Sequence, residues 1–130
     1  AAPTKLYVAN ADNQTIQSVN LSTLAVSVLA GGANTSGTAN ATGTAARFNE
    51  PYGVVRVSST DFYVADTWNN RIQVFQADGA FVRAWGEPGL GTGEYQFFGP
   101  RDVVVTRQGF VIVSDTGIGI RPEGSMLIEN

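Results

Sequence analysis

The sequence predicts an all-β protein made of a repeated antiparallel unit, and three observations lead to this fold class. Residues 63–86 contain an apolar run that ends at Asp66, an alternating run at 71–76, a turn at 77–79 and a second alternating run at 80–85. Alternation with period two is typical of strands with one buried face, and a glycine-bearing turn between two such runs is typical of a hairpin. The chain also has 15 glycines and only 15% charged residues, which indicates many turns between short strands. The third observation is that the unit recurs.

A weaker copy of the unit opens the chain. Strands are predicted at residues 5–10, 15–21 and 24–30, with a polar corner at 11–13. These runs follow the same order as those of residues 63–86, so the copy supplies three strands of one unit. The strand that would open this unit would precede residue 1.

Residues 31–46 contain glycine, alanine, asparagine, threonine and serine and no large apolar side chain. Because such a composition cannot build a core, we expect a mobile surface loop. Asparagine sequons of the N-x-[ST] type occur here and upstream, and they are either glycan acceptors of a secreted protein or chance matches in a segment rich in Asn and Thr. The four sequons are at Asn13, Asn20, Asn34 and Asn40, of which the two in the loop are the better candidates.

The unit returns with a constant spacing. Phe48 and Pro51 are followed 49 residues later by Phe97 and Pro100, and a β-branched run follows each proline. A period near 50 residues with about four short strands per repeat is typical of β-propeller blades. In each blade proline opens the inner strand, where its missing N–H costs little.

The chain is therefore predicted to form a single segment, residues 1–130, divided into blade one (1–32), a loop (33–46), blade two (47–86) and blade three (87–130). The last two strands of blade three are predicted at 117–121 and 125–130. Fewer than three full blades cannot close a ring of the usual roughly four to eight. We expect a partial propeller that belongs to a longer one or is completed by oligomerisation, since its end faces would otherwise stay exposed.

Four stretches resemble NHL-repeat propeller sequence: F-N-E-P-Y-G-V-V at 48–55, F-Y-V-A-D-T-W-N-N-R-I-Q-V-F at 62–75, D-G-A-F-V-R-A-W-G at 78–86 and G-T-G-E-Y-Q-F-F-G-P-R-D-V-V-V at 91–105. The resemblance implies NHL-type blades of four antiparallel strands. It fades after Asp115, where the N-N-R-I-Q-V-F-like strand is missing. Propellers related to this fold include calcium-dependent lactonases, and the NHL group includes zinc lyases, so the resemblance leaves an enzymatic alternative open.

The composition excludes several kinds of site. The chain has no cysteine and no histidine, which removes disulfides, thiolate metal sites and the commonest general base. A net charge of −3 argues against a nucleic-acid partner, and no apolar run is long enough for a membrane span. Glu50, Asp102 and Asp115 stand singly, without the spacing that gathers six to eight oxygens around Ca²⁺. We predict no metal and no cofactor.

The polar corner that follows Asp66 has two interpretations. Asp66, Asn69, Asn70 and Arg71 bring a carboxylate, two amides and a guanidinium together, as a catalytic site would. The structural interpretation is stronger, because Asp and Asn cap turns by accepting backbone N–H bonds and Arg71 can pair with a nearby carboxylate. The polar corner at 11–13 repeats the pattern, as scaffold residues should.

Trp68 departs from the resembled pattern, which usually has glycine at this corner. A tryptophan there either covers a neighbouring blade or stands exposed as a binding anchor. Tyr52 and Arg101 occupy matching positions after the two prolines, and in propellers that entry and the Trp68 corner tend to open onto one face. We predict a binding site formed by Trp68, Asn69, Tyr52 and Arg101.

The function predicted from these features is a non-enzymatic interaction scaffold that presents the loops of one face to a protein or a glycan. One alternative is part of a propeller hydrolase or lyase with a metal in the central channel, and another is a structural assembly module. The small residues at the start, Ala1-Ala2-Pro3-Thr4, could remain after signal cleavage, so an extracellular or periplasmic location is expected.

Overall fold

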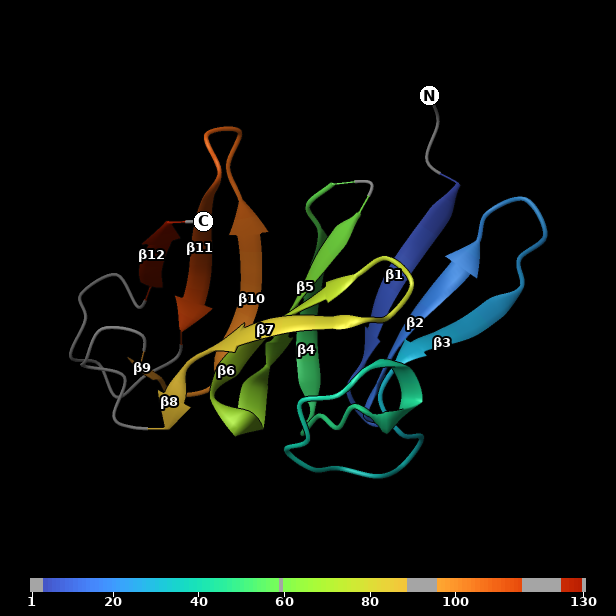
Figure 1. The fold of residues 1–130 in the computed structure, drawn as a ribbon, viewed down its shortest axis with the longest axis horizontal. Coiled ribbons are helices and arrows are strands. Elements are labelled where there is room, and N and C mark those ends of the chain that lie inside the picture. Colours follow the sequence, from blue (N-terminus) through green and yellow to red (C-terminus); the bar gives the residue numbers. More distant parts are fainter. Residues whose placement is uncertain (1–3, 59, 89–95, 116–124, 130) are drawn as a thin grey trace.

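The computed structural model describes residues 4–58, 60–88, 96–115 and 125–129, and within them the regular secondary structure is β-strand apart from two short 3₁₀ turns (Figure 1). No helix in these ranges is long and apolar enough to cross a membrane. The strands are β1 Lys5–Asn10, β2 Thr15–Asn20, β3 Val26–Ala30, β4 Pro51–Arg56, β5 Asp61–Asp66, β6 Arg71–Gln76, β7 Phe81–Trp85, β8 Glu87–Pro88, β9 Gln96–Phe97, β10 Pro100–Val105, β11 Phe110–Asp115 and β12 Ser125–Glu129. Two short 3₁₀ turns, η1 Gly43–Ala45 and η2 Thr67–Asn69, connect some of them.

Three antiparallel sheets stand in a row in chain order. Blade one has the order β1-β2-β3, blade two β4-β5-β6-β7 and blade three β10-β11-β12. A small parallel pair, β8-β9, lies between blades two and three in the sequence. In Figure 1 the blades fan out from one another, with β1–β3 at the N-terminal end and β10–β12 at the other. The prediction of an all-β, partial propeller with a complete four-stranded blade two is confirmed.

Blade three differs from its prediction in one respect. Strand β12 pairs directly with β11, with Val113 opposite Met126 and Ser114 opposite Ser125. Residues 125–129 therefore occupy the third position of the sheet, where the sequence had indicated 117–121. The predicted strand at 117–121 itself lies outside the described residues.

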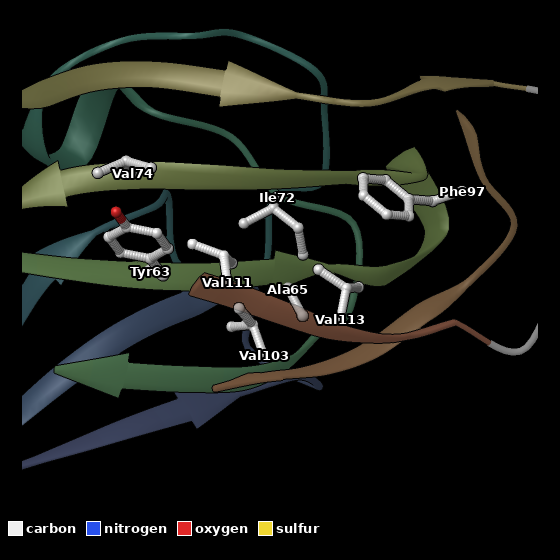
Figure 2. Packing of buried hydrophobic residues seen from close by; sticks show 8 residues of the cluster. All are labelled: Tyr63, Ala65, Ile72, Val74, Phe97, Val103, Val111 and Val113. Atoms are coloured by element: carbon white, nitrogen blue, oxygen red, sulfur yellow. The ribbon is translucent and has the colours of Figure 1, made fainter. Parts of the chain in front are cut away.

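The core consists of two apolar layers, one on each side of blade two. Between blades two and three lie Tyr63, Ala65, Ile72, Val74, Phe97, Val103, Val111 and Val113 (Figure 2). Between blades one and two lie Ile16, Ala30, Ala46, Phe48, Phe62, Val64 and Phe75. Aromatic rings dominate the second layer, where Phe62 and Phe75 stack at 5.4 Å between centroids.

Strands β5 and β6 are buried on both faces, and here the expectation of one buried face was wrong. Along β5, Phe62 and Val64 pack toward blade one, whereas Tyr63 and Ala65 pack toward blade three. A central strand between two neighbouring blades has no solvent side. Two polar positions of β6 that had suggested a solvent-facing side, Arg71 and Gln73, are buried as well, and only Gln76 at the end of the strand is exposed.

The loop of residues 33–46 lies at the surface but is held in place by hydrogen bonds, contrary to the expectation of a mobile segment. The Gly43 N–H donates to the Gly79 carbonyl at 2.8 Å. The Phe81 N–H donates to Thr42 Oγ1 at 3.1 Å, and Ala46 is fully buried in the layer between blades one and two. The small side chains of this segment allow its backbone to pack closely, so backbone groups supply the contacts that large apolar side chains would supply elsewhere.

Candidate functional site at the strand corners

The corner between β5 and β6 is organised around the buried carboxylate of Asp66. Four donors reach it, and Arg71 also forms an ion pair with it. The donors are the Asn49 N–H at 2.8 Å, Asn69 Nδ2 at 3.0 Å, Arg71 Nε at 2.8 Å and Gln73 Nε2 at 3.1 Å. The predicted pairing of Arg71 with a nearby carboxylate is confirmed, and the acceptor capacity of Asp66 is used by the scaffold.

Arg71 connects this carboxylate to the loop of residues 33–46. Its Nη1 donates to the Thr38 carbonyl at 2.9 Å and to Asn40 Oδ1, and its Nη2 donates to the Arg47 carbonyl at 3.0 Å. Four of the five N–H donors of this guanidinium are thus engaged within the protein, which supports a structural role.

Burial raises the pKa of Asp66. Desolvation raises the pKa of this carboxyl above its ordinary value of 3.8, although the Asn49 N–H and the Arg71 and Asn69 side chains all act to lower it. Removing a carboxylate from water disfavours its charged form, and here this effect is the largest.

Blade three repeats one contact of the corner. The Phe98 N–H donates to Asp115 Oδ1 at 2.9 Å, as the Asn49 N–H does to Asp66 Oδ1 at 2.8 Å. Both bonds join the residue two positions before the inner strand to the end of the second strand of the same blade. A contact that recurs at equivalent positions belongs to the blade architecture.

A second repeated bond joins neighbouring blades, and sequence reasoning missed it. The Glu50 N–H donates to Gln14 Oε1 at 2.7 Å, and the Gly99 N–H donates to Asn70 Oδ1 at 2.9 Å. Gln14 and Asn70 are equivalent corner residues, and both have positive φ angles, 64° and 56°. In the sequence, Gln14 and Asn70 occupy the same position in their two repeats, and this equivalence could have marked them as inter-blade contacts.

Two β-bulges place Tyr52 and Arg101 on the same side as Trp68. In blade two, Pro51 pairs with Asp66 and the register then shifts before Gly53, so Tyr52 is the extra residue. Blade three has the same shift around Arg101. A bulge leaves one residue unpaired and redirects its side chain, which is why bulges are frequent beside functional sites.

The three side chains form a stack in which Arg101 lies between two aromatic rings. Its Cζ is 4.8 Å from the centroid of the Tyr52 ring and 5.2 Å from that of the Trp68 ring. Tyr52 is 41% exposed and Trp68 42% exposed, so solvent reaches both rings. The Tyr52 hydroxyl donates to Glu50 Oε1 at 3.2 Å. We call Tyr52, Trp68 and Arg101 the aromatic–arginine stack.

Asn69 lies at the same corner but has other partners. Its Nδ2 donates to the Gly37 carbonyl at 2.6 Å as well as to Asp66. Three of the four predicted binding residues are therefore gathered in the stack, and the fourth holds the loop of residues 33–46.

The four sequon asparagines have different surroundings. Asn34 is exposed, and its backbone N–H donates to the Asn13 carbonyl at 2.8 Å. Asn40 Oδ1 accepts from Arg71, whereas Asn20 Oδ1 accepts the N–H groups of its own turn. Asn34 and Asn40 are both exposed, Asn13 and Asn20 are half-buried, and glycosylation remains a prediction.

An open groove of about 390 Å³ lies at the other ends of β4 and β10, lined by residues 55–57, 105–107 and Gly109. Arg56 beside it donates to the Ser58 carbonyl at 2.9 Å. Among the described residues, no three acidic side chains come close enough to hold a metal ion.

Comparison with known proteins agrees with this architecture. Residues 48–75, which include β4 to β6 up to Phe75, match the NHL repeat family. This segment is therefore an NHL repeat. Protein brain tumor of Drosophila melanogaster is 40% identical to it over 70 residues, which is 53% of this chain and 7% of that protein.

Solved structures share the fold at low sequence identity. A putative phosphatase from Bacteroides thetaiotaomicron aligns with a TM-score of 0.69 and 17% identity over 98% of this NHL chain and 33% of that chain. An auxiliary nutrient binding protein from Bacteroides ovatus aligns with a TM-score of 0.69 and 15% identity over 97% of this chain and 35% of that chain. This chain thus spans about a third of each of these structures.

Proposed function

We propose that this NHL chain is a non-enzymatic interaction scaffold that binds a protein or glycan partner through the aromatic–arginine stack. The observation that carries the proposal is the exposure of Tyr52 and Trp68 around a guanidinium, at positions that bulges direct away from the sheet. Most other polar groups of the corner are engaged in scaffold bonds, whereas the stack has exposed ring surface. Tyr, Trp and Arg are the residues most enriched among binding hot spots.

The test is a selection of ligands for the wild-type chain, followed by substitution of Trp68. A random peptide library displayed on phage is panned against the immobilised chain, and the selected peptides are titrated against purified protein. For a hot-spot residue we expect Trp68→Ala to raise Kd about thirtyfold or more. Val82→Ala on the outer strand β7 is the control, because Val82 is exposed to a similar extent, 39%.

Far-UV circular dichroism and urea unfolding establish that both variants are folded. Binding that is lost in Trp68→Ala and kept in Val82→Ala supports the proposal. Equal binding by the two variants, or no peptide or glycan probe that depends on Trp68, would overturn it.

A second function, assembly with another blade, is favoured by the free face of blade one. Leu6, Val19 and Val26 are cross-strand neighbours on this face, and Leu6 is 53% exposed. Leu6 and Val19 occupy the positions of Phe62 and Phe75 in blade two, which blade one covers completely. We propose that another blade, from a longer propeller or a second copy, covers this face in the same way.

Size-exclusion chromatography with light scattering separates these two sources. A mass of at least twice 13.7 kDa that returns toward 13.7 kDa in Leu6→Asp indicates a second copy. A wild-type chain that remains at 13.7 kDa would assign the covering blade to a longer propeller. An extracellular or periplasmic location is part of the proposal, and the nutrient binding described for a fold neighbour is compatible with a binding role.

A further inference from the structure

We infer that the aromatic–arginine stack recognises a carboxylate of a protein partner, with the Arg101 guanidinium as the group that receives it. This inference rests on the proposed function and adds the chemistry of the ligand. The inference concerns only the Arg101 guanidinium, so it can be wrong while the binding role of the stack is right.

The first step is the geometry of Arg101. Its Cζ lies 4.8 Å from the Tyr52 ring centroid and 5.2 Å from the Trp68 ring centroid, so the guanidinium is held between two aromatic groups. Arginine stacks on aromatic faces while its N–H donors remain in the guanidinium plane. The stack therefore restricts the side chain before a ligand arrives, which reduces the entropy lost on binding.

The second step is the state of those donors. Within residues 4–58, 60–88, 96–115 and 125–129, the guanidinium of Arg101 has neither an ion pair nor a hydrogen bond. Arg71 at the same corner differs, since it donates to Asp66 and to the loop of residues 33–46. A planar guanidinium with open N–H groups matches the two oxygens of a carboxylate, to which it donates two parallel hydrogen bonds.

The third step distinguishes a charged ligand from a neutral sugar. A sugar would stack on an aromatic face, and the guanidinium already covers one face of the Tyr52 ring and one of the Trp68 ring. The Tyr52 hydroxyl is also occupied, because it donates to Glu50. The part of the stack that a ligand can reach most directly is the positively charged edge of the Arg101 guanidinium, which is bordered by aromatic rings.

The fourth step favours a protein as the source of the carboxylate. Phe98, which is 39% exposed, lies three residues before Arg101. Its neighbour Gly99 donates its N–H to Asn70 Oδ1, two residues after Trp68, so an exposed aromatic residue adjoins this contact between the two corners. Aromatic residues and arginine with little other charge are the composition of protein–protein interface cores. An aspartate or glutamate next to an apolar residue of the partner fits this surface.

The experiment uses peptides selected by panning on the wild-type chain. Each selected peptide is synthesised in two forms, one with its Asp or Glu and one with Asn or Gln in that place. Both forms are titrated by fluorescence anisotropy against wild type, Arg101→Gln and Arg101→Lys. We expect acidic residues to be enriched at one peptide position, and the amide form to bind the wild type about tenfold more weakly.

The arginine variants connect this preference to Arg101. In Arg101→Gln the acidic and amide forms should bind equally, at the level of the wild type with the amide form. Arg101→Lys should recover only part of the difference, since a lysine does not form the paired hydrogen bonds. A preference that persists in Arg101→Gln would overturn the inference.

The remaining outcomes separate the inference from the function on which it rests. Peptides that depend on Trp68 but bind equally well as acid and amide would overturn the inference and leave the proposed function standing. Trigalacturonate is the glycan probe. If trigalacturonate binds and no peptide can be selected, the inference that the carboxylate belongs to a protein is overturned. If no probe depends on Trp68, both the inference and the proposed function fail.

Discussion

Replacing Asp66 with alanine removes the acceptor shared by four donors in the corner between β5 and β6. Asn69 keeps its bond to the Gly37 carbonyl. The Asn49 N–H and Gln73 Nε2 lose the Asp66 carboxylate as their acceptor. Arg71 would remain as a charge that is 90% covered and lacks its carboxylate, since its side chain is only 10% exposed. Breaking a buried pair from one side costs about 3–5 kcal/mol, a large part of the roughly 5–15 kcal/mol that holds a typical domain together.

Urea unfolding followed by tryptophan fluorescence measures this loss. Asp66→Asn is the milder variant, because its amide oxygen can still accept the Asn49 N–H, although its NH2 group cannot accept the three bonds that Oδ2 receives. Adding Arg71→Met to Asp66→Ala should recover part of the free energy, since the unpaired charge then disappears. A loss below about 1 kcal/mol in Asp66→Ala, typical of exposed ion pairs, would refute the assignment of Asp66 as the centre of the corner.

Three further predictions concern the backbone and the pH dependence. Glu50 has a φ of 53° at the position that Gly99 occupies in blade three, so the free energy of unfolding in urea should be about 1 kcal/mol higher for Glu50→Gly than for Glu50→Ala. Equal free energies would contradict backbone strain at this position. A Cβ at Gly53 would lie 2.7 Å from Asp102 Oδ1 and 2.8 Å from a backbone carbonyl, so Gly53→Ala should cost about 1–3 kcal/mol by thermal unfolding, and an unchanged midpoint would argue against the close approach of β4 and β10. Because burial raises the pKa of Asp66, the folded state holds this proton more tightly than the unfolded chain. The stabilisation that this proton provides is complete below pH 3.8 and is lost as pH rises through the raised pKa of Asp66. The free energy of unfolding of wild type relative to Asp66→Asn should therefore fall over that pH window, and a constant difference would contradict the prediction.

The repeat was readable from the sequence because blades reuse the same residues at the same spacing. Phe48 and Phe97 both enter apolar layers between blades, as their common position indicated. The double burial of β6 was not readable, because Gln73 looks like a solvent-facing position. The structure shows that the Gln73 side-chain amide donates a hydrogen bond to the Asp66 carboxylate. A period-two pattern reports which side chains share a face, but it does not report whether a neighbouring sheet covers the polar face.

The candidate site was predictable in part for the same reason. Trp68 broke the repeat, and Tyr52 and Arg101 stood at matching positions, so the sequence brought these three together. The bulges that redirect Tyr52 and Arg101 depend on strand register, which residue type alone does not reveal. Asn69 was grouped with them by proximity along the chain, but its amide lies against Gly37.

The loop of residues 33–46 shows the limit of reasoning from composition. Its residues are small and polar, which is typical of mobile segments, yet Arg71 and backbone partners hold it against blades one and two. Small side chains exclude an apolar core but allow close backbone hydrogen bonding.

In the proposed function, the corner residues form a scaffold and the aromatic–arginine stack binds the partner. Two-dimensional ¹H–¹⁵N spectra of the labelled chain, recorded as a selected peptide is added, test this directly, because the two tryptophan indole N–H signals report on different places. Trp68 belongs to the stack, whereas Trp85 packs against Tyr63 with Arg83 over its ring. The account predicts that the Trp68 indole signal and the Arg101 side-chain signals shift while Trp85 stays in place. Shifts confined to Trp85, or to the groove at residues 105–107, would contradict it.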